Sequence, residues 1–390
     1  MMMTNILNKP VITGHKSFFP DLLPVKFEGQ ESKNPLSYRF YQPHREVFGK
    51  KLKDWLKPSL NYWEQDPNRP WHQGRDAMAR ARYTMDAFFE FASKLGFEQY
   101  CFHDYDLIEQ GSSFAEYEKN LQGIGEYAKT KQELGSFALL CAAASSKWPK
   151  RFKSGFPVLA CNALRAKNTL DLCKILDARF YGFLDSCDLE GKSLARAHLA
   201  ELFRAVQNYA KKIDFKGELL LFAGDLLPDI SQAALFLKQH NLHSKAVLML
   251  QSSEALRELL SLENEELAGL KLDGLALFNA DLLKAALMIM QNQELDFGFS
   301  LELKALSLNE LALLHIRQID AMARAFLMAE VVLETTDYLK QKKARADELL
   351  KDLNLPSSLE DLRRSAYELG LPRAVLKEEG IEEGLLGLYV

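Results

Sequence analysis

The sequence contains few cysteines, and they form no recognisable pattern. Among its 390 residues there are five cysteines, Cys101, Cys141, Cys161, Cys173 and Cys187, an odd number without a CxxC pair. This argues against a disulfide framework and against a zinc knuckle. We therefore expect a protein that resides in a reducing compartment.

Long apolar runs and an excess of charge of one sign are also missing. No window of about 18 apolar residues appears, and residues 1–14 lack the basic and apolar regions of a signal peptide. The net charge is -4 and the pI is near 6.1, which gives no electrostatic footprint for nucleic acid or for acidic membranes. These absences predict a soluble, cytoplasmic protein that binds neither nucleic acid nor membranes.

What the chain does contain is a regular alternation of short β-rich runs with amphipathic helices. Such alternation implies right-handed βαβ crossovers and a parallel sheet. No GxGxxG or GxxxxGK[ST] motif follows a predicted strand, which counts against a nucleotide-binding fold. About eight units can be counted, so the sequence favours a closed α/β fold, the TIM (β/α)8 barrel. The predicted strands are 59–63, 99–102, 137–141, 179–184, 218–222, 245–250, 274–278 and 297–301.

The helices follow from apolar residues spaced by three and four positions. After the last strand the pattern becomes helical only, beginning with a long apolar-rich helix over 309–333. We assign residues 1–335 to the barrel and 336–390 to a C-terminal helical arm that forms oligomers, because the arm has too little apolar sequence for a core of its own. The helices predicted within the barrel are 74–95, 113–133, 167–176, 193–213, 229–240, 253–260 and 281–291.

The most informative motif is the run from Tyr100 to Asp106, a short apolar strand that ends in one imidazole and two carboxylates. Catalytic residues of α/β barrels lie at the carboxyl ends of the strands. A carboxylate that accepts a hydrogen bond from one imidazole nitrogen fixes the tautomer presented by the other, so His103 and Asp106 are candidates for acid–base chemistry. The alternative is a structural histidine at a strand end.

Several sequence blocks resemble the longer-chain class of xylose isomerases. In that family a metal-dependent aldose–ketose isomerase is built on an α/β barrel, and a C-terminal arm embraces a neighbouring subunit of a tetramer. The resemblance therefore implies a homo-oligomer, either a dimer or a tetramer, with a related active isomerase as a further partner to consider. The blocks are Lys26-Phe27-Glu28-Gly29, Asn34-Pro35-Leu36 with Tyr41, Tyr62-Trp63, Asn68-Arg69-Pro70-Trp71, Cys101 to Asp106, His315-Ile316 and Asp320-Ala321-Met322.

The resemblance also implies roles for individual residues. His103, oriented by Asp106, matches the histidine that assists opening of the sugar ring. Trp63 matches a tryptophan that packs against the sugar, and Phe102 is a second expected substrate-binding residue.

The same resemblance shows where this chain departs from the family, whose hydride shift needs two divalent cations such as Mg²⁺ or Mn²⁺ held by carboxylates. Phe222 stands at the position of a metal-bridging glutamate, and Gly224 at that of a catalytic lysine. The amide Gln251 replaces a glutamate, whereas Glu254 occupies a former ligand position. Leu277 replaces an aspartate at the seventh strand, and Glu302 is a remnant acid at the eighth strand.

Three hypotheses remain open at this stage. The first is a pseudoenzyme that keeps the fold and the oligomer-forming arm and binds no metal or other cofactor. The second is an active aldose–ketose isomerase of the xylose/xylulose type with a remodelled Mg²⁺ or Mn²⁺ site. The third is a metal-free enzyme of another class that uses His103 and Asp106. The acids available for a remodelled site are Asp185, Asp188, Asp225, Glu254, Asp281 and Glu302.

Overall fold

The computed structural model describes most of the chain up to Thr335. The residues described are 17–63, 69–72, 74–109, 113–144, 156–184, 192–222, 227, 230–242, 245–250, 267–272, 286–287, 290, 300–301 and 308–335. The chain divides into two compact units, Met1–Glu330 and Val331–Val390. The predicted arm, 336–390, lies outside the described residues, and its role stays a prediction.

Eight parallel strands form the central sheet of the first unit. Their order is β10-β3-β4-β5-β6-β7-β8-β9, so that each strand from β3 to β9 lies beside the next one in the chain. The two ends of this order, β9 and β10, contact each other, and the sheet therefore curves round as an α/β barrel, as predicted. The strands are β3 Ser59–Asn61, β4 Gln99–His103, β5 Ala138–Ala143, β6 Phe180–Leu184, β7 Glu218–Phe222, β8 Lys245–Leu250, β9 Leu267–Leu272 and β10 Ser300–Leu301.

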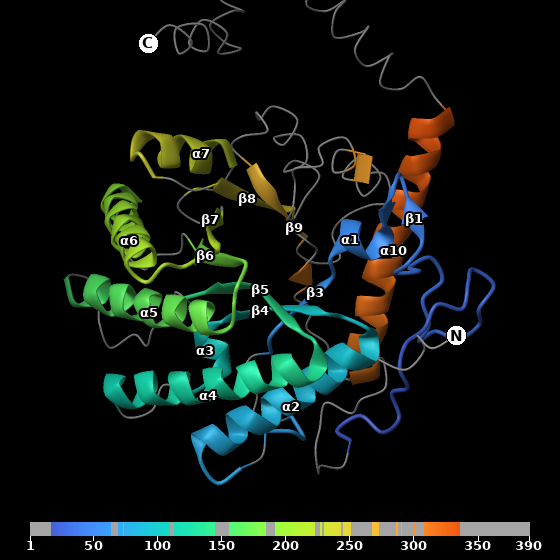
Figure 1. The fold of residues 1–390 in the computed structure, drawn as a ribbon, viewed down its shortest axis with the longest axis horizontal. Coiled ribbons are helices and arrows are strands. Elements are labelled where there is room, and N and C mark those ends of the chain that lie inside the picture. The colour runs from blue at the N-terminus through green and yellow to red at the C-terminus, as the bar shows by residue number, and fades with distance from the viewer. Residues whose placement is uncertain are drawn as a thin grey trace, which may run out of the picture. The chain divides into compact units, whose positions relative to one another are not determined.

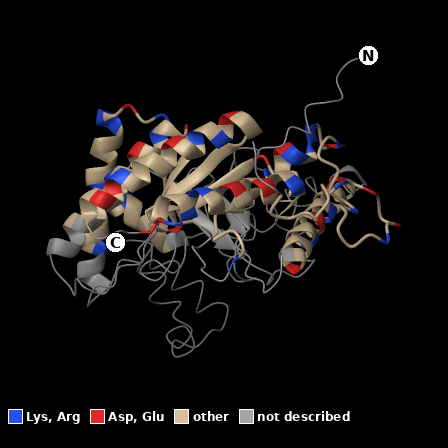
Figure 2. Cartoon of the chain, turned by 90° about the horizontal axis from the view of Figure 1, so that it is seen from below, with Lys and Arg blue, Asp and Glu red and all other residues tan. Residues whose placement is uncertain are grey.

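Helices connect each strand to the next from β3 to β8 and lie outside the sheet, with α4, α5, α6 and α7 side by side in chain order (Figure 1). Lys, Arg, Asp and Glu are interspersed along these helices, whereas the strands are mostly uncharged (Figure 2). The pattern is that of an apolar sheet covered by helices with one solvated face. The helices are α1 Leu52–Leu56, α2 Ala77–Leu95, α3 Asp104–Leu107, α4 Phe114–Gly135, α5 Phe156–Ile175, α6 Lys192–Lys212, α7 Ile230–Gln239 and α10 Leu308–Thr335; a small hairpin, β1 Glu46–Val47 and β2 Lys50–Lys51, precedes α1.

Helix α2 shows why the local sequence folds as it does. The side chain of Asp76 accepts a hydrogen bond from the backbone N–H of Ala79 at 2.8 Å and caps the first turn. Gly96 ends the helix in the left-handed region, with φ 74°, as the sequence predicts. The helix buries an apolar face that includes Met85, Phe88, Phe89 and Ala92. Burial of this face against the strands holds the helix on the barrel.

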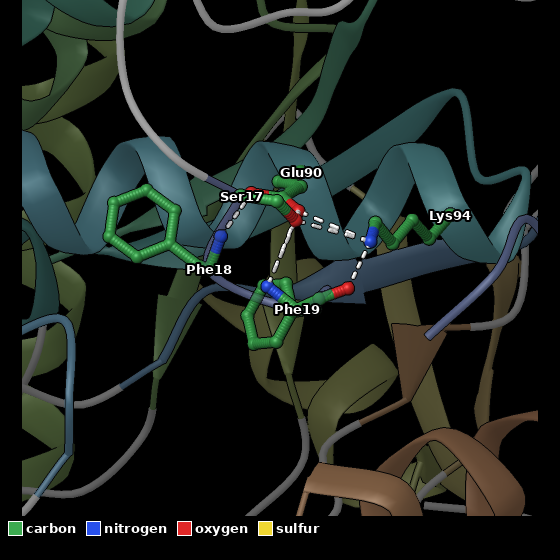
Figure 3. Close-up of polar contacts among 5 residues, drawn as sticks. All are labelled: Ser17, Phe18, Phe19, Glu90 and Lys94. Atoms are coloured by element: carbon green, nitrogen blue, oxygen red, sulfur yellow. Dashed lines mark hydrogen bonds and ion pairs between the residues drawn. The ribbon is translucent and has the colours of Figure 1, made fainter. Parts of the chain in front are cut away.

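The N-terminal segment is held on the barrel by two buried carboxylates. Glu90 of α2 accepts hydrogen bonds from Ser17 and from the backbone N–H groups of Phe18 and Phe19, and Lys94 pairs with Glu90 at 3.3 Å (Figure 3). Asp320 of α10 accepts hydrogen bonds from three consecutive backbone N–H groups, those of residues 39, 40 and 41, at 2.8, 3.0 and 2.9 Å. The two carboxylates satisfy backbone donors that have no strand partner.

The structure differs from the sequence prediction at two elements. The seventh strand of the sheet is β9 at Leu267–Leu272, whereas the strand predicted at 274–278 lies outside the described residues. Its position is set by pairing with β8, from Ala246 opposite Leu267 to Leu250 opposite Leu272. Helix α5 begins at Phe156, earlier than the predicted residue 167, because Pro157 fits the first turn of a helix. Over the described residues, no helix combines the length and the hydropathy that a membrane span requires.

Candidate functional site

The motif that ends β4 lies where the barrel fold positions functional groups. His103 is the last residue of β4, with extended backbone (φ -100°, ψ 142°), and α3 starts at the next residue. Its side chain is partly exposed. Among the described residues, β4 is the one strand of the sheet that ends in an ionisable side chain. The other strands end in Asn61, Ala143, Leu184, Phe222, Leu250, Leu272 and Leu301.

Alternation along β4 separates the two faces of the strand. The rings of Tyr100 and Phe102 stack at 6.3 Å between centroids, and Tyr100 packs against Phe88 and Phe89 of α2. These two residues therefore face the helical layer. Successive side chains point to opposite faces of a strand, so Cys101 and His103 face the barrel interior.

The structure brings the predicted residues to one end of the barrel but in different environments. Phe102 is only 3% exposed and lies on the face of β4 opposite to His103, which leaves its predicted substrate contact without support. Asp106 is buried in α3 near Tyr62, whose pKa is raised first by burial and then by the carboxylates of Asp106 and Asp86. The predicted orientation of His103 by Asp106 stays a prediction. Glu254 and Glu302 lie outside the described residues.

Trp63, two residues beyond β3, belongs to an aromatic cluster that we define as Phe19, Trp63, Trp71, Phe88 and Phe91. Its ring lies 4.8 Å from that of Trp71, and between 5.3 and 6.3 Å from the other three. The side chain is partly exposed. One part of the indole is therefore packed against α2 while another part is left accessible, as a residue that packs against a ligand requires.

A buried ion pair beside the motif was not found from the sequence. Asp104 accepts hydrogen bonds from the Nε and Nη2 atoms of Arg165 at 3.0 and 2.8 Å, and from the hydroxyl of Tyr117 at 2.7 Å. Asp104 and Arg165 are almost fully buried. Burial and the Asp104 carboxylate raise the pKa of Tyr117, which therefore remains a hydrogen-bond donor. The signal in the sequence that could have indicated this ion pair is Arg165, a single arginine within the apolar run of α5.

A second ion pair anchors the chain that leaves the motif. The Glu109 carboxylate accepts hydrogen bonds from Nε and Nη2 of Arg80 at 2.9 and 2.8 Å, and His72 Nε2 lies 3.9 Å from it. Hydrogen bonds from Arg80 hold the pKa of Glu109 below its usual range. Together the two ion pairs fix α3 and the residues after it, and so the direction in which the backbone presents His103.

The described part of the chain does not contain a recognisable metal centre. Within the described ranges, no group of three or more His, Cys, Asp or Glu side chains is arranged to hold an ion. The acids considered for a remodelled site, Asp185, Asp188, Asp225, Glu254, Asp281 and Glu302, all lie outside those ranges.

The fold and the site together define a class of protein. It is a parallel α/β barrel with an acid–base motif at the carboxyl end of its second strand. Over 437 aligned residues the chain is 29% identical to the xylose isomerase of Bacteroides thetaiotaomicron, covering 96% of this chain and 99% of that protein. It is 28% identical to the xylose isomerase of Arabidopsis thaliana, covering 94% and 89% of the two chains. The chain is therefore a divergent homologue of the xylose isomerases.

No family model matches the chain. Among solved structures, a xylose isomerase-like TIM barrel protein from Mycobacterium smegmatis in complex with magnesium aligns with a TM-score of 0.46 and 11% identity, covering 72% of this chain and 99% of that chain.

Proposed function

We propose that this xylose isomerase-like barrel is a catalytically inactive homologue that retains the fold and the oligomer-forming arm. The observation that carries the proposal is the chemistry of the strand ends: among the described strands, only β4 ends in an ionisable residue, His103. The acid–base motif is retained, while the groups that it would serve are replaced.

The physical reason lies in the coordination of hard cations. Mg²⁺ and Mn²⁺ take oxygen ligands, chiefly carboxylates, which must converge from several strands. Strand β7 ends at Phe222, where the resemblance predicts a metal-bridging glutamate, and β8 ends at Leu250, followed in the sequence by the amide Gln251. An aromatic ring and an amide do not replace two carboxylates, so these residues do not fit a two-metal centre of the family type.

The residue at the position of the catalytic lysine supports the same conclusion. Gly224 stands where the resemblance predicts that lysine. Loss of a cationic group and of metal ions at a developing negative charge removes several kcal/mol of transition-state stabilisation. Isomerisation of xylose at a rate measurable for an active family member is therefore not expected.

A barrel without this chemistry would act as a binding or structural subunit in the cytoplasm. We propose that residues 336–390 join copies of this chain, or this chain and an active isomerase, into a dimer or tetramer. Removal of 336–390 is expected to lower the oligomeric state measured by light scattering. A truncated chain of unchanged oligomeric state would refute the role of the arm and leave the inactivity proposal untouched.

A second candidate function, an active isomerase with a remodelled metal site, is favoured by one specific observation. Besides Asp104 after β4, acidic residues directly follow the last residues of three strands: Asp185 after β6, Asp273 after β9 and Glu302 after β10. The corrected position of β9 adds Asp273 to the acids considered from sequence. Neighbouring strand ends can supply several carboxylates to one cation.

Metal analysis and turnover together separate the two candidates. Purified full-length protein is dialysed against Mg²⁺, Mn²⁺ or Co²⁺, its tightly bound metal is quantified, and isomerisation of xylose and glucose is followed. The inactivity proposal predicts neither tightly bound metal nor turnover. Two bound ions per chain together with turnover that His103→Asn abolishes would establish the isomerase instead. His44→Asn is the matched control, because His44 is exposed and belongs to the N-terminal segment far from the end of β4.

A further inference from the structure

A cavity lies at the end of the barrel opposite to His103. It has a volume of about 380 Å³ and is lined where β3 and β4 begin, with Pro58 just before β3 and Glu98 and Gln99 at the start of β4. At roughly 3.3 Å per residue, the length of β4 puts about 13 Å between Gln99 and His103. The cavity is therefore separate from the candidate site described above. Its volume is that of a pocket for a small organic molecule.

Aromatic rings form the walls of this cavity. Tyr38 and Tyr41 are both buried, and their rings meet edge to face, 5.1 Å apart at an interplanar angle of 79°. The Tyr38 hydroxyl donates a hydrogen bond to the carbonyl oxygen of Leu95 at 2.8 Å, which fixes this ring. Phe27, 42% exposed, also lines the cavity. These walls are preformed and suit a flat, apolar ring.

The lysines of the lining outnumber its acids by one. Three lysines, Lys26, Lys53 and Lys57, line the cavity together with two acids, Asp54 and Glu98. Lys53 Nζ lies 3.4 Å from Glu98 Oε2, so one acid is already balanced within the lining. A ligand that brings one negative charge is therefore better accommodated than one that brings a positive charge.

Tyr41 adds a hydrogen-bond donor to this lining. Burial, followed by the carboxylates of Glu98 and Asp54, raises the pKa of Tyr41. The phenol therefore keeps its proton at neutral pH. A protonated phenol beside the lysines can donate to a carboxylate oxygen.

We propose that this cavity binds a small aromatic carboxylate, with the ring between the aromatic walls and the carboxylate at the lysines. The exposed side of the cavity carries Ser93, in the last turn of α2, and Gly96, where a Cβ atom would meet nothing within 4 Å. Entry from this side requires no opening of the barrel. The ligand would bind without contact to His103.

Titration calorimetry on the full-length chain tests this proposal with two probes of similar shape, 2-naphthoate and the uncharged 2-naphthamide. We expect 2-naphthoate to bind at least tenfold more tightly than the amide. Lys57→Gln is expected to remove most of that preference, because it deletes one positive charge of the lining. Lys119→Gln is the control, since Lys119 is an exposed lysine of α4 outside the cavity.

A blocking variant shows where the probe binds. Ser93→Trp is expected to fill the cavity and to weaken naphthoate binding at least tenfold, and Phe27→Ala is expected to weaken it severalfold. Both positions are exposed, so the variants should unfold at the same denaturant concentration as the original chain. Absence of naphthoate binding, equal affinity for the two probes, or an affinity that Ser93→Trp leaves unchanged would each overturn the proposal.

Discussion

Breaking the buried ion pair between Asp104 and Arg165 should strongly destabilise the barrel. The pair joins the residue after His103 to helix α5, 61 positions away in the sequence, through hydrogen bonds of 2.8 and 3.0 Å. Asp104 is 0% exposed and Arg165 is 1% exposed. Arg165→Met keeps much of the side-chain volume and removes the charge. The Asp104 carboxylate then stays buried without the cation that balances it.

The expected loss is about 3–5 kcal/mol in the free energy of unfolding, the usual cost of removing one partner of a buried ion pair. Most of that cost reflects the uncompensated charge and not the worth of the pair itself. Replacing both partners, together with the tyrosine that donates to Asp104, should therefore cost less. We expect the triple variant Asp104→Leu, Arg165→Met, Tyr117→Phe to be more stable than Arg165→Met alone.

Urea unfolding followed by circular dichroism gives the free energies of unfolding for the original chain, for Arg165→Met and for the triple variant. Lys167→Met, two residues further along α5 and partly exposed, is the matched control and should change stability by less than about 1 kcal/mol. A loss below about 1 kcal/mol for Arg165→Met would refute the reasoning. So would a triple variant that is less stable than Arg165→Met.

Three further predictions concern the rest of the first unit. Asp320→Ala should lower the free energy of unfolding by about 3 kcal/mol, because the three backbone N–H groups of 39–41 lose a charged acceptor. Urea unfolding measures this loss, and a value below about 1 kcal/mol would contradict the prediction. Burial lowers the pKa of His315 from 6.5 to about 4 in the folded chain. As the pH falls below 6.5, the imidazole is therefore protonated in the unfolded chain before it is protonated in the folded chain. Stability should then decrease by up to about 3 kcal/mol between pH 6.5 and 4, and a His315→Phe variant that kept the same pH dependence would disprove this assignment. Glu90→Gln should expose 17–19 to limited proteolysis, and an unchanged cleavage rate would show that Glu90 does not hold the segment.

The elements that local patterns could predict were predicted well. The strands at 218–222 and 245–250 agree with β7 and β8 residue by residue, and 99–102 agrees with β4 except for His103. Apolar runs bounded by helices carry this information within a few residues of the chain. The run Leu267–Leu272 was not predicted as a strand, and its pairing with β8 is what identifies it as β9.

The candidate site was likewise predicted in part from the sequence. The sequence placed His103 at the carboxyl end of a strand, and the resemblance indicated the family and the replaced positions Phe222 and Gly224. It could not show that Tyr100 and Phe102 face the helical layer, or that Arg165 balances Asp104, since both facts depend on how distant segments pack.

The sequence by itself therefore determined the class of fold, the order of its elements and the chemical character of the strand ends, because hydrophobic period and residue type are local properties. The tertiary structure alone decided three things: which apolar run became β9, which buried carboxylates hold the N-terminal segment, and that Tyr38, Tyr41 and three lysines line one cavity. Each of these depends on contacts between residues far apart in the chain, which a local pattern of the sequence does not specify.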